Sequence, residues 1–472
     1  MKRTQILPVL AAAVLLGPLS TPAASQSVDF EALGDEALEY LQQYLRVNTI
    51  NPPGNESRGV EFFARIFDAE GIAYESAESA PGRGNIWARL EGGDQPALVM
   101  IHHMDVVPAD ERYWDDDPLS GKVEGDHVYG RGALDTKTGG IIHLQTFLAL
   151  HRAGIRLNRD VIFMATADEE AGGFFGAGWL VENKPELFEG VGFLLNEGGG
   201  GALIDGQTSF GIEVTQKVPW WFRLTATGEP GHGSRPLRSY SVTSLIAALE
   251  RVRLHSSEHR MVPAVDAYFK GIAANAEAPW NTAFADMDAT IGDPALMEKL
   301  HDENPGLHAL TRNTCSITIL EASEKINVVP PQAAAELDCR LLPDQDPDAF
   351  IRELESVIAD ESIEIETLMG FTPAVSPTDT DLYRSIETVL DGEFPNAPVV
   401  PSVVGGFTDS HFFRDLGITS YGYEATATPF EDEGGVHGND ERVTEENVRR
   451  GVAMTLKILE RFAATRPVME DQ

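Results

Sequence analysis

The chain has 472 residues, of which 42% are hydrophobic and 23% are charged, and its formal net charge is −38. This length predicts two domains, because a single hydrophobic core rarely grows beyond about 250–300 residues, and the hydrophobic content is typical of a soluble globular protein. The strong negative charge argues against nucleic acid and anionic membranes as partners, since both would repel the protein.

The N-terminus has the layout of a secretory signal peptide. Lys2 and Arg3 precede an apolar run that ends at Leu19, and small residues follow it. The run is too short for a comfortable membrane span, and no later segment is apolar enough for one. We therefore expect residues 1–25 to be removed on export, giving a secreted, periplasmic protein without a membrane anchor.

The first half of the remaining chain alternates helices with short apolar strands. Helical spacing covers residues 30–47, 60–70 and 139–153, and apolar strands are expected at 85–90, 97–101, 161–166 and 192–196. Such alternation predicts an α/β fold, in which a mainly parallel mixed sheet is sandwiched by helices.

The pattern changes near Lys217, where alternating strands and isolated helices begin. Residues 218–372 are expected to form an inserted α+β domain, lengthened by a helical, Ala-rich stretch at about 261–305. The α/β pattern then resumes, so residues 26–217 and 373–472 are expected to form one domain together. The only cysteines, Cys315 and Cys339, are compatible with one disulfide or with two buried thiols.

Three carboxylates, Asp168, Glu169 and Glu170, lie where the apolar strand 161–166 is expected to end, and two glycines follow shortly after them. Ligands bind at the carboxyl ends of strands in open α/β sheets. Adjacent acids repel one another unless a cation or a proton lies between them. The alternative is an acidic turn exposed to solvent. The residues at the neighbouring strand ends decide between a ligand site and such a turn.

Other potential metal ligands also follow strands or lie in glycine-rich loops. His103 and Asp105 end the strand 97–101, and two residues apart on a strand they share a face. Asp135 precedes a helix, Glu197 follows the strand 192–196, and His437 lies between glycines. Each alone is compatible with an ordinary turn, a helix cap or a structural histidine.

Together, two imidazoles and three carboxylates are expected at one edge of the sheet, from His103, Asp135, Glu170, Glu197 and His437. This ligand set suits Zn²⁺, with Co²⁺ or Mn²⁺ as substitutes. Two ions can be held only if one carboxylate is shared, which places them about 3.5–4 Å apart.

The chain resembles the di-zinc amidohydrolases that include aminoacylase, acetylornithine deacetylase, succinyl-diaminopimelate desuccinylase and glutamate carboxypeptidase. The resemblance runs from about residue 30 to the end of the chain. Its segment from Arg312 to Pro331 looks most like the carboxypeptidase S and N-fatty-acyl-amino-acid hydrolase branch. Five motifs in order carry the resemblance: His103-Met-Asp105-Val-Val, Gly130-Arg-Gly-Ala-Leu-Asp135-Thr-Lys, Asp168-Glu-Glu170-Ala-Gly-Gly, Asn196-Glu197-Gly and His437-Gly-Asn-Asp-Glu.

The resemblance implies a role for each ligand. Asp135 would bridge two Zn²⁺ ions, His103 and Glu197 would complete one ion, and Glu170 and His437 would complete the other. It also implies that the inserted domain serves as a lid and, in family members that dimerise, as the dimer contact.

Two further acids receive catalytic roles from the resemblance. Asp105 would orient the ring of His103. Glu169 would be the general base that takes a proton from a metal-bridging water and passes it to the leaving amine. A carboxylate next to a ligand can reach such a water only if it is not itself a ligand, which is expected of Glu169.

The inserted domain carries further candidates by resemblance. His232 would stabilise the oxyanion, often from a partner subunit, although Gly233 here separates it from the Ser that usually follows. Asn327 and Arg340 match positions that hold a substrate carboxylate, and Gly406 lies in the family's glycine-rich substrate loop. A salt bridge is the alternative for Arg340. Trp220, Trp221 and Trp280 are candidates for an acyl pocket or for ordinary packing.

The sequence thus predicts a zinc-dependent hydrolase that cleaves the amide bond before a C-terminal amino acid, in short peptides or N-acyl amino acids. A dipeptidase or aminopeptidase that recognises a free α-amine is one alternative. A non-catalytic metal- or peptide-binding protein is another, although the unligated Glu169 argues against it. A homodimer through the inserted domain is possible, and a monomer is equally compatible with the sequence.

Overall fold

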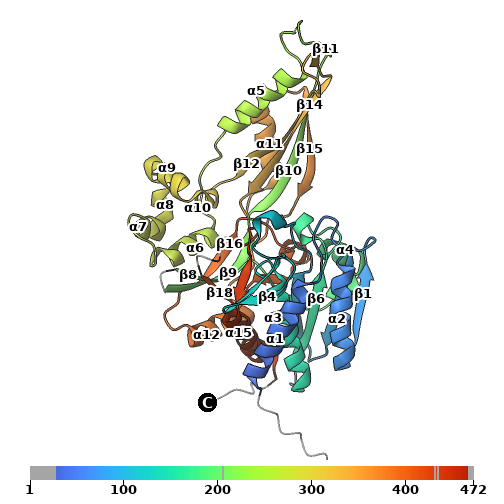
Figure 1. Cartoon of the computed structure of the whole chain (residues 1–472). Helices are drawn as coiled ribbons and strands as arrows, with labels where there is room; N and C mark the ends of the chain where they lie inside the picture. Colours follow the sequence, from blue (N-terminus) through green and yellow to red (C-terminus); the bar gives the residue numbers. More distant parts are fainter. Residues whose placement is uncertain (1–27, 205–206, 236, 430–431, 433–434, 466–472) are drawn as a thin grey trace, which may run out of the picture.

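The structure is a computed structural model of the chain, and it describes residues 28–204, 207–235, 237–429, 432 and 435–465. An elongated domain rises from one end of a larger body built on a wide sheet (Figure 1). The expected signal peptide, residues 1–25, lies outside the described residues. Within them, no helix combines the length and the apolar character needed to cross a bilayer.

The wide sheet is mixed and has ten strands. In chain order they are β1 (Tyr74–Glu78), β2 (Gly84–Leu90), β3 (Gln95–His103), β6 (Arg159–Thr166), β7 (Val191–Asn196), β8 (Gly200–Ile204), β9 (Gln207–Gln216), β16 (Val399–Val404), β17 (Thr419–Gly422) and β18 (Ala427–Pro429). They lie in the order β1–β2–β6–β3–β7–β17–β9–β8–β18, and β16 pairs with β9. The strands β6, β3, β7 and β17 are parallel.

Helices bury both faces of this sheet. One face packs against α1 (Phe30–Leu45), α2 (Ser57–Glu70), α3 (Lys137–Arg152), α12 (Asp381–Glu393) and α15 (Glu445–Ala463), and the other against α4 (Ala177–Asn183) and α13 (Ser410–Asp415). Along β3, Leu98 and Met100 join the first core whereas Val99 and Ile101 join the second. Burial on both faces explains why this strand is a continuous apolar run. The predicted α/β class is confirmed.

The elongated domain, called the lid below, is an antiparallel sheet covered on one face by two helices. Its strands are β10 (Val218–Thr227), β12 (Thr314–Glu321), β14 (Gln332–Leu341) and β15 (Ile363–Gly370), and its helices are α5 (Ser241–Leu254) and α11 (Pro347–Ile358). Cys315 and Cys339 face each other across β12 and β14 and form a disulfide, which decides the alternative left open by the sequence. Short strands β11 (Gly231–His232) and β13 (Val328–Val329) pair at the far tip (Figure 1).

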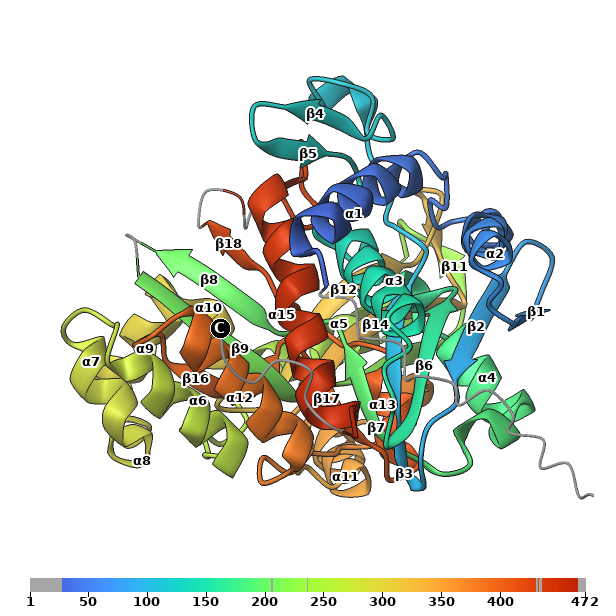
Figure 2. The same ribbon diagram turned by 90° about the horizontal axis from the view of Figure 1, so that it is seen from below.

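The helical stretch between α5 and β12 does not pack on the lid sheet. It forms α6 (Pro263–Ala273), α7 (Trp280–Ala283), α8 (Met287–Thr290), α9 (Pro294–Glu303) and α10 (Pro305–Ala309). Its apolar side chains form a separate core with Leu342 and Val403. Figure 2 shows α6 beside β16 and β9 of the wide sheet. The lid sheet and the helical stretch thus have separate apolar cores.

A small three-stranded sheet closes the larger body near the start of α15. It consists of β4 (Lys122–Glu124), β5 (His127–Tyr129) and β19 (Arg442–Thr444), and β5 is its central strand. It ties the loop that follows β5, which carries Asp135, to the loop that precedes β19, which carries His437. Two segments about 300 residues apart in sequence are thereby held together.

Candidate active site

The carboxyl ends of parallel strands bring most of the expected ligands to one edge of the sheet. His103 is the last residue of β3, Glu170 lies in the short turn after β6, and Glu197 follows β7 directly. Asp135 comes from the loop before α3, and His437 from the loop before β19. All five expected ligands lie close together.

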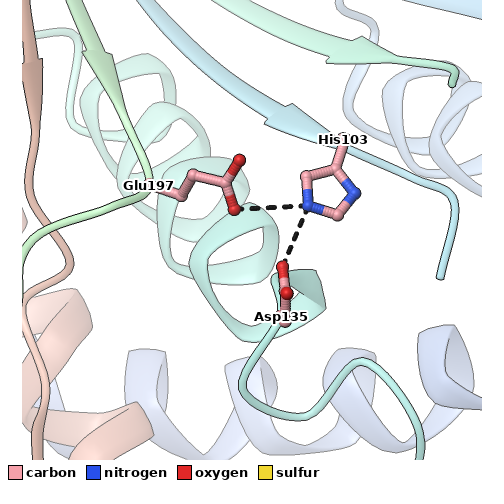
Figure 3. A group of neighbouring side chains, drawn as sticks. All are labelled: His103, Asp135 and Glu197. Atoms are coloured by element: carbon pink, nitrogen blue, oxygen red, sulfur yellow. Dashed lines mark hydrogen bonds and ion pairs between the residues drawn. The ribbon is translucent and has the colours of Figure 1, made fainter. Parts of the chain in front are cut away.

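One group of ligands consists of His103, Asp135 and Glu197 (Figure 3). The Nε2 atom of His103 lies 3.1 Å from Oδ1 of Asp135 and 3.2 Å from Oε2 of Glu197. The ring is buried, and its Nδ1 points away from the group. One nitrogen and two carboxylate oxygens therefore converge on one point.

A second group consists of Asp135, Glu170 and His437. Nε2 of His437 lies 3.0 Å from Oδ2 of Asp135 and 3.2 Å from Oε2 of Glu170. Asp135 thus directs one oxygen to each group. This is the shared carboxylate that two neighbouring cations require, and the pairing is the one implied by the family resemblance.

The electrostatics of the two groups fit divalent cations. Burial raises the pKa of Glu197 to about 7, and burial with the charge of Glu197 raises the pKa of Glu169 well above its usual range. Hydrogen bonds to Asp135 and Glu170 raise the pKa of His437 to about 10. Burial is the largest cause for the two glutamates, and neighbouring carboxylates add to the pKa shifts of all three groups. A cation between the ligands would neutralise that negative charge.

The loop that carries Asp135 is held by a residue that the sequence did not single out. The buried carboxylate of Glu441 accepts the backbone N–H groups of Gly132 at 3.0 Å, Leu134 at 2.6 Å and Asp135 at 3.0 Å. It also pairs with Arg131 Nη1 at 2.7 Å. Its only sequence signal was its place at the end of the motif that contains His437.

Asp105 orients its neighbours differently from the expectation. Nδ1 of His103 donates to the backbone carbonyl of Asp105 at 2.9 Å, whereas the nearer carboxylate oxygen is 3.5 Å away. The carboxylate instead accepts the backbone N–H groups of Glu169 at 3.1 Å and Glu170 at 3.3 Å, and the side chain of Asn51 at 2.7 Å. It therefore positions the acidic turn, and the main chain positions the histidine.

Two residues of the site adopt left-handed backbone conformations. Asp168, which precedes the acidic turn, has φ 74°, and His437 has φ 55°. Residues other than glycine adopt such backbone angles at an energetic cost, and these strained conformations cluster at functional sites. Asp168 is held there by a buried ion pair with Arg83 and by the backbone N–H of Phe175 at 3.0 Å.

Glu169 belongs to neither ligand group. Its side chain is buried, and Oε2 lies 3.9 Å from Nε2 of His103. It lines a cavity of about 540 Å³ together with four of the five ligands, Asp135, Glu170, Glu197 and His437. A carboxylate placed beside the ligands but outside both groups can exchange a proton with a molecule bound there.

The lid base contributes Arg340 to this cavity, which Gly406 and Phe407 also line. Nε of Arg340 bonds to Oδ1 of Asp338 at 2.7 Å, and Nη2 to Oδ2 at 3.2 Å. The third nitrogen, Nη1, is buried and has no hydrogen-bond partner among the described residues. The salt bridge expected as an alternative therefore exists, but it leaves one donor unused.

His232 and Asn327 are not brought to the cavity within the chain. His232 is in β11, Asn327 immediately precedes β13, and the Gly233 N–H donates to the Asn327 carbonyl at 2.9 Å. Both residues are exposed at the lid tip, at the end remote from the wide sheet (Figure 1). Asn327 therefore lies beside His232 and not beside Arg340.

Comparison with known proteins identifies the family. The profile of Peptidase family M20/M25/M40 matches residues 99–461. The chain belongs to this family. N-fatty-acyl-amino acid synthase/hydrolase PM20D1 of Xenopus tropicalis is 30% identical over 388 residues, which are 79% of this chain and 74% of the relative. Aminoacylase-1 of Homo sapiens is 27% identical over 442 residues, or 91% and 96% of the two chains.

Solved structures agree with the fold. The M20 family metallo-carboxypeptidase Sso-CP2 from Sulfolobus solfataricus matches with a TM-score of 0.70 at 19% identity, over 90% of this chain and 98% of that one. Human carnosine dipeptidase 1 matches with a TM-score of 0.64 at 17% identity, over 91% and 97%. The recognition of the family from its motifs is confirmed. The M20 chain is a metal-binding hydrolase of amide bonds in peptides or N-acyl amino acids.

Proposed function

We propose that the protein is an exported, zinc-dependent hydrolase that cleaves the amide bond before a C-terminal amino acid, in short peptides or N-acyl amino acids. One observation carries the proposal: Nη1 of Arg340 is buried without a hydrogen-bond partner among the described residues, in the cavity that Glu169 and four of the five ligands line. A guanidinium pairs with a carboxylate through parallel hydrogen bonds. The free α-carboxylate of a substrate supplies the missing acceptor.

The ligand set supports two Zn²⁺ ions, with Co²⁺ or Mn²⁺ as substitutes. His103 and Glu197 would hold one ion, and Glu170 and His437 would hold the other. Asp135 would be a ligand of both ions. When bound, zinc polarises a carbonyl group and lowers the pKa of water.

Glu169 supplies the proton transfers. Its carboxylate takes a proton from the attacking water and delivers it to the nitrogen of the leaving amino acid. The hydrogen bond from its backbone N–H to Asp105, at 3.1 Å, fixes the turn that aims it. Proton transfer by a positioned side chain contributes about 10²–10⁴-fold to the rate of such reactions.

Export to the periplasm is part of the proposal. Its support is the N-terminal sequence, in which Lys2 and Arg3 precede an apolar run. The disulfide between Cys315 and Cys339 agrees with it, since disulfides persist in oxidising compartments.

A homodimer through the lid also belongs to the proposal. His232 and Asn327 are exposed together at the lid tip, remote from their own cavity. In a symmetric dimer each lid tip would complete the site of the partner, where His232 would stabilise the developing oxyanion.

The test compares matched substrates on purified, zinc-restored protein. We expect hydrolysis of N-acyl amino acids and N-blocked dipeptides, loss of activity with EDTA, and much slower hydrolysis when the terminal carboxylate is amidated. Turnover of substrates with a free α-amine alone would replace the proposal with the dipeptidase alternative. No turnover of any substrate at full zinc content would favour a binding protein.

A further inference from the structure

A pocket outside the catalytic cavity lies where the helical stretch meets the lid. Its volume is about 270 Å³, and none of its described lining residues lines the catalytic cavity. Its apolar floor belongs to the lid core and includes Val252 of α5 and Phe350 and Leu354 of α11. Its polar lining also includes His301 of α9, from the helical stretch. The pocket therefore joins two segments that have separate apolar cores.

The charged groups of this pocket are mainly basic, although acidic residues outnumber lysine and arginine in the chain by 74 to 36. Among the described lining residues the basic side chains are Arg253, His255, His301 and Arg312, and Glu353 is the only acid. Arg253 already pairs with Glu250 on the same helix. Nε2 of His255 lies 2.7 Å from Oε1 of Glu353. Arg312 and His301 are thus the basic groups without a carboxylate partner in the pocket.

Arg312 has no ion pair with a described residue. Its Nη1 donates to the hydroxyl of Ser256, and its buried Nε has no hydrogen-bond partner among the described residues. Burial lowers the pKa of Arg312, and no neighbouring carboxylate opposes this effect. A partly desolvated charge is costly unless a counter-charge lies beside it. An anion bound in the pocket would supply that counter-charge.

The positive charge of Arg312 also acts on the ionisable groups around it. Burial lowers the pKa of His308 to about 4, and the charge of Arg312 is the next cause. The same two causes lower the pKa of His259. Burial and then the charge of Arg312 lower the pKa of Lys217 to about 7. The region around Arg312 therefore has a positive potential, which attracts anions.

The main chain on both sides of this guanidinium group is held in place. The backbone carbonyl of Arg312 accepts a hydrogen bond from the buried Nζ of Lys217. The side-chain oxygen of Asn313 accepts the backbone N–H of Leu342 at 2.8 Å. A group that is already fixed loses less conformational freedom when a ligand binds, and this favours affinity.

We propose that this pocket binds a small anion that carries a phosphate group, with Arg312 as the central contact and His301 beside it. A guanidinium group donates parallel hydrogen bonds to phosphate oxygens. The basic groups come from three places, namely the end of α5, α9 and the segment before β12. Donors from several directions suit a tetrahedral anion better than a planar carboxylate. The bound anion links the helical stretch to the lid.

Calorimetric titration of the purified, zinc-loaded protein with inorganic phosphate tests the inference. We expect saturable binding, and Arg312→Gln should weaken it at least about tenfold, as expected for a lost hydrogen bond to a charged group. Arg352→Gln is the matched control, because Arg352 is exposed on α11 and does not line the pocket. It should bind phosphate like the wild type. Absence of saturable binding, or equal affinity in Arg312→Gln, would overturn the inference.

Glu353→Gln provides a test with the opposite sign. It removes the only carboxylate among the described lining residues, so less like charge faces the anion and phosphate should bind several-fold more tightly. This test remains available if Arg312→Gln does not fold. Unchanged or weaker binding in Glu353→Gln would contradict a phosphate site at this place.

Phosphate can also bind to zinc in the catalytic cavity, so Glu170→Gln, which lacks one metal ligand, is titrated in parallel. It should keep the phosphate site. Loss of binding in Glu170→Gln with normal binding in Arg312→Gln would place phosphate at the metal site and overturn the inference.

Two further ligands define the chemistry of the bound group. Acetate should bind at least about tenfold more weakly than phosphate, and equal affinity would overturn the preference for a tetrahedral anion. Glycerol 3-phosphate distinguishes free phosphate from a phosphate ester, because the ligand that binds more tightly identifies the source of the group. None of these measurements depends on hydrolysis, so their failure leaves the proposed function untouched.

Discussion

The carboxylate of Glu441 accepts the backbone N–H of Asp135 at 3.0 Å, although it belongs to neither ligand group. The same carboxylate pairs with the buried Arg131. We expect Glu441→Gln to displace the loop, because an amide nitrogen replaces one acceptor oxygen. The variant should bind zinc about 10–100-fold more weakly, which is the usual effect of mutating a residue that hydrogen-bonds to a metal ligand. Chelator competition measures the affinity.

Glu446→Gln serves as the control, because Glu446 is exposed and its carboxylate pairs with Arg450, one turn away on α15. It should bind zinc normally. Unchanged zinc affinity in Glu441→Gln would mean that the loop holds its shape without this carboxylate.

Glu169 and Glu170 are neighbours with different expected roles, so they form a matched pair. Glu169→Gln should keep its zinc and lose about 10²–10⁴-fold in kcat, because only proton transfer is removed. Glu170→Gln should lose zinc as well as activity, because it removes a ligand. Metal content and kcat measured on both proteins check this. Turnover near the wild-type rate in Glu169→Gln would eliminate the mechanism.

Arg340 distinguishes carboxylate recognition from a purely structural ion pair. We expect Arg340→Leu to lower kcat/KM for free-carboxylate substrates by about 10–100-fold, the value of a lost hydrogen bond to a charged group. Amidated substrates should change little, since they lack the charge. If Arg340 served only its ion pair with Asp338, both substrate types would lose activity equally, and Asp338→Asn would reproduce the effect.

Glu56 makes stability depend on pH. Burial, together with the carboxylate of Asp105, raises its pKa to about 8, although Arg83 Nη2 lies 3.1 Å from it. Between its usual pKa and 8 the folded chain binds more protons than the unfolded chain. The free energy of unfolding therefore falls with rising pH, by at most about 1.4 kcal/mol per pH unit from this group.

Glu56→Gln should remove this contribution. In urea titrations the variant and the wild type should have similar stability at about pH 5, and the variant should be the more stable protein at about pH 8.5. Glu61→Gln, at an exposed position of α2, the helix that begins directly after Glu56, should follow the wild type at both pH values. Parallel curves for all three proteins would show that Glu56 ionises normally.

The sequence predicted the strands and ligands that depend on local pattern. The apolar runs of β3, β6 and β7 are buried on both faces, so their hydrophobicity revealed them. Parallel strands end at one edge, which is why residues as distant as His103 and Glu197 were expected together. Their detailed pairing with Asp135 required the family pattern.

Features that depend on tertiary contacts were not predictable from the pattern of apolar and polar residues in the sequence. The strand β8 begins with two glycines, so no apolar alternation marks it. The strand β9 does carry alternating buried residues, Phe210, Ile212 and Val214, which the sequence-based prediction did not use. The docking of α6 on β16 depends on an approach so close that a Cβ at Gly271 would lie 2.0 Å from Val400. Glu441 acts through backbone N–H groups, which leave no signature in side-chain spacing.

The remote position of His232 predicts complementation between subunits. Glu169→Gln and His232→Ala should each be inactive alone. In a mixed dimer, the chain with intact Glu169 receives His232 from its partner, so one complete site forms. After mixing and re-association we expect about a quarter of the wild-type activity, because half of the dimers are mixed and each has one complete site.

A mixture of Glu169→Gln with Glu170→Gln should stay inactive, since both changes affect the same site. A monomer in light scattering, or a mixture without recovered activity, would show that His232 does not act across a dimer.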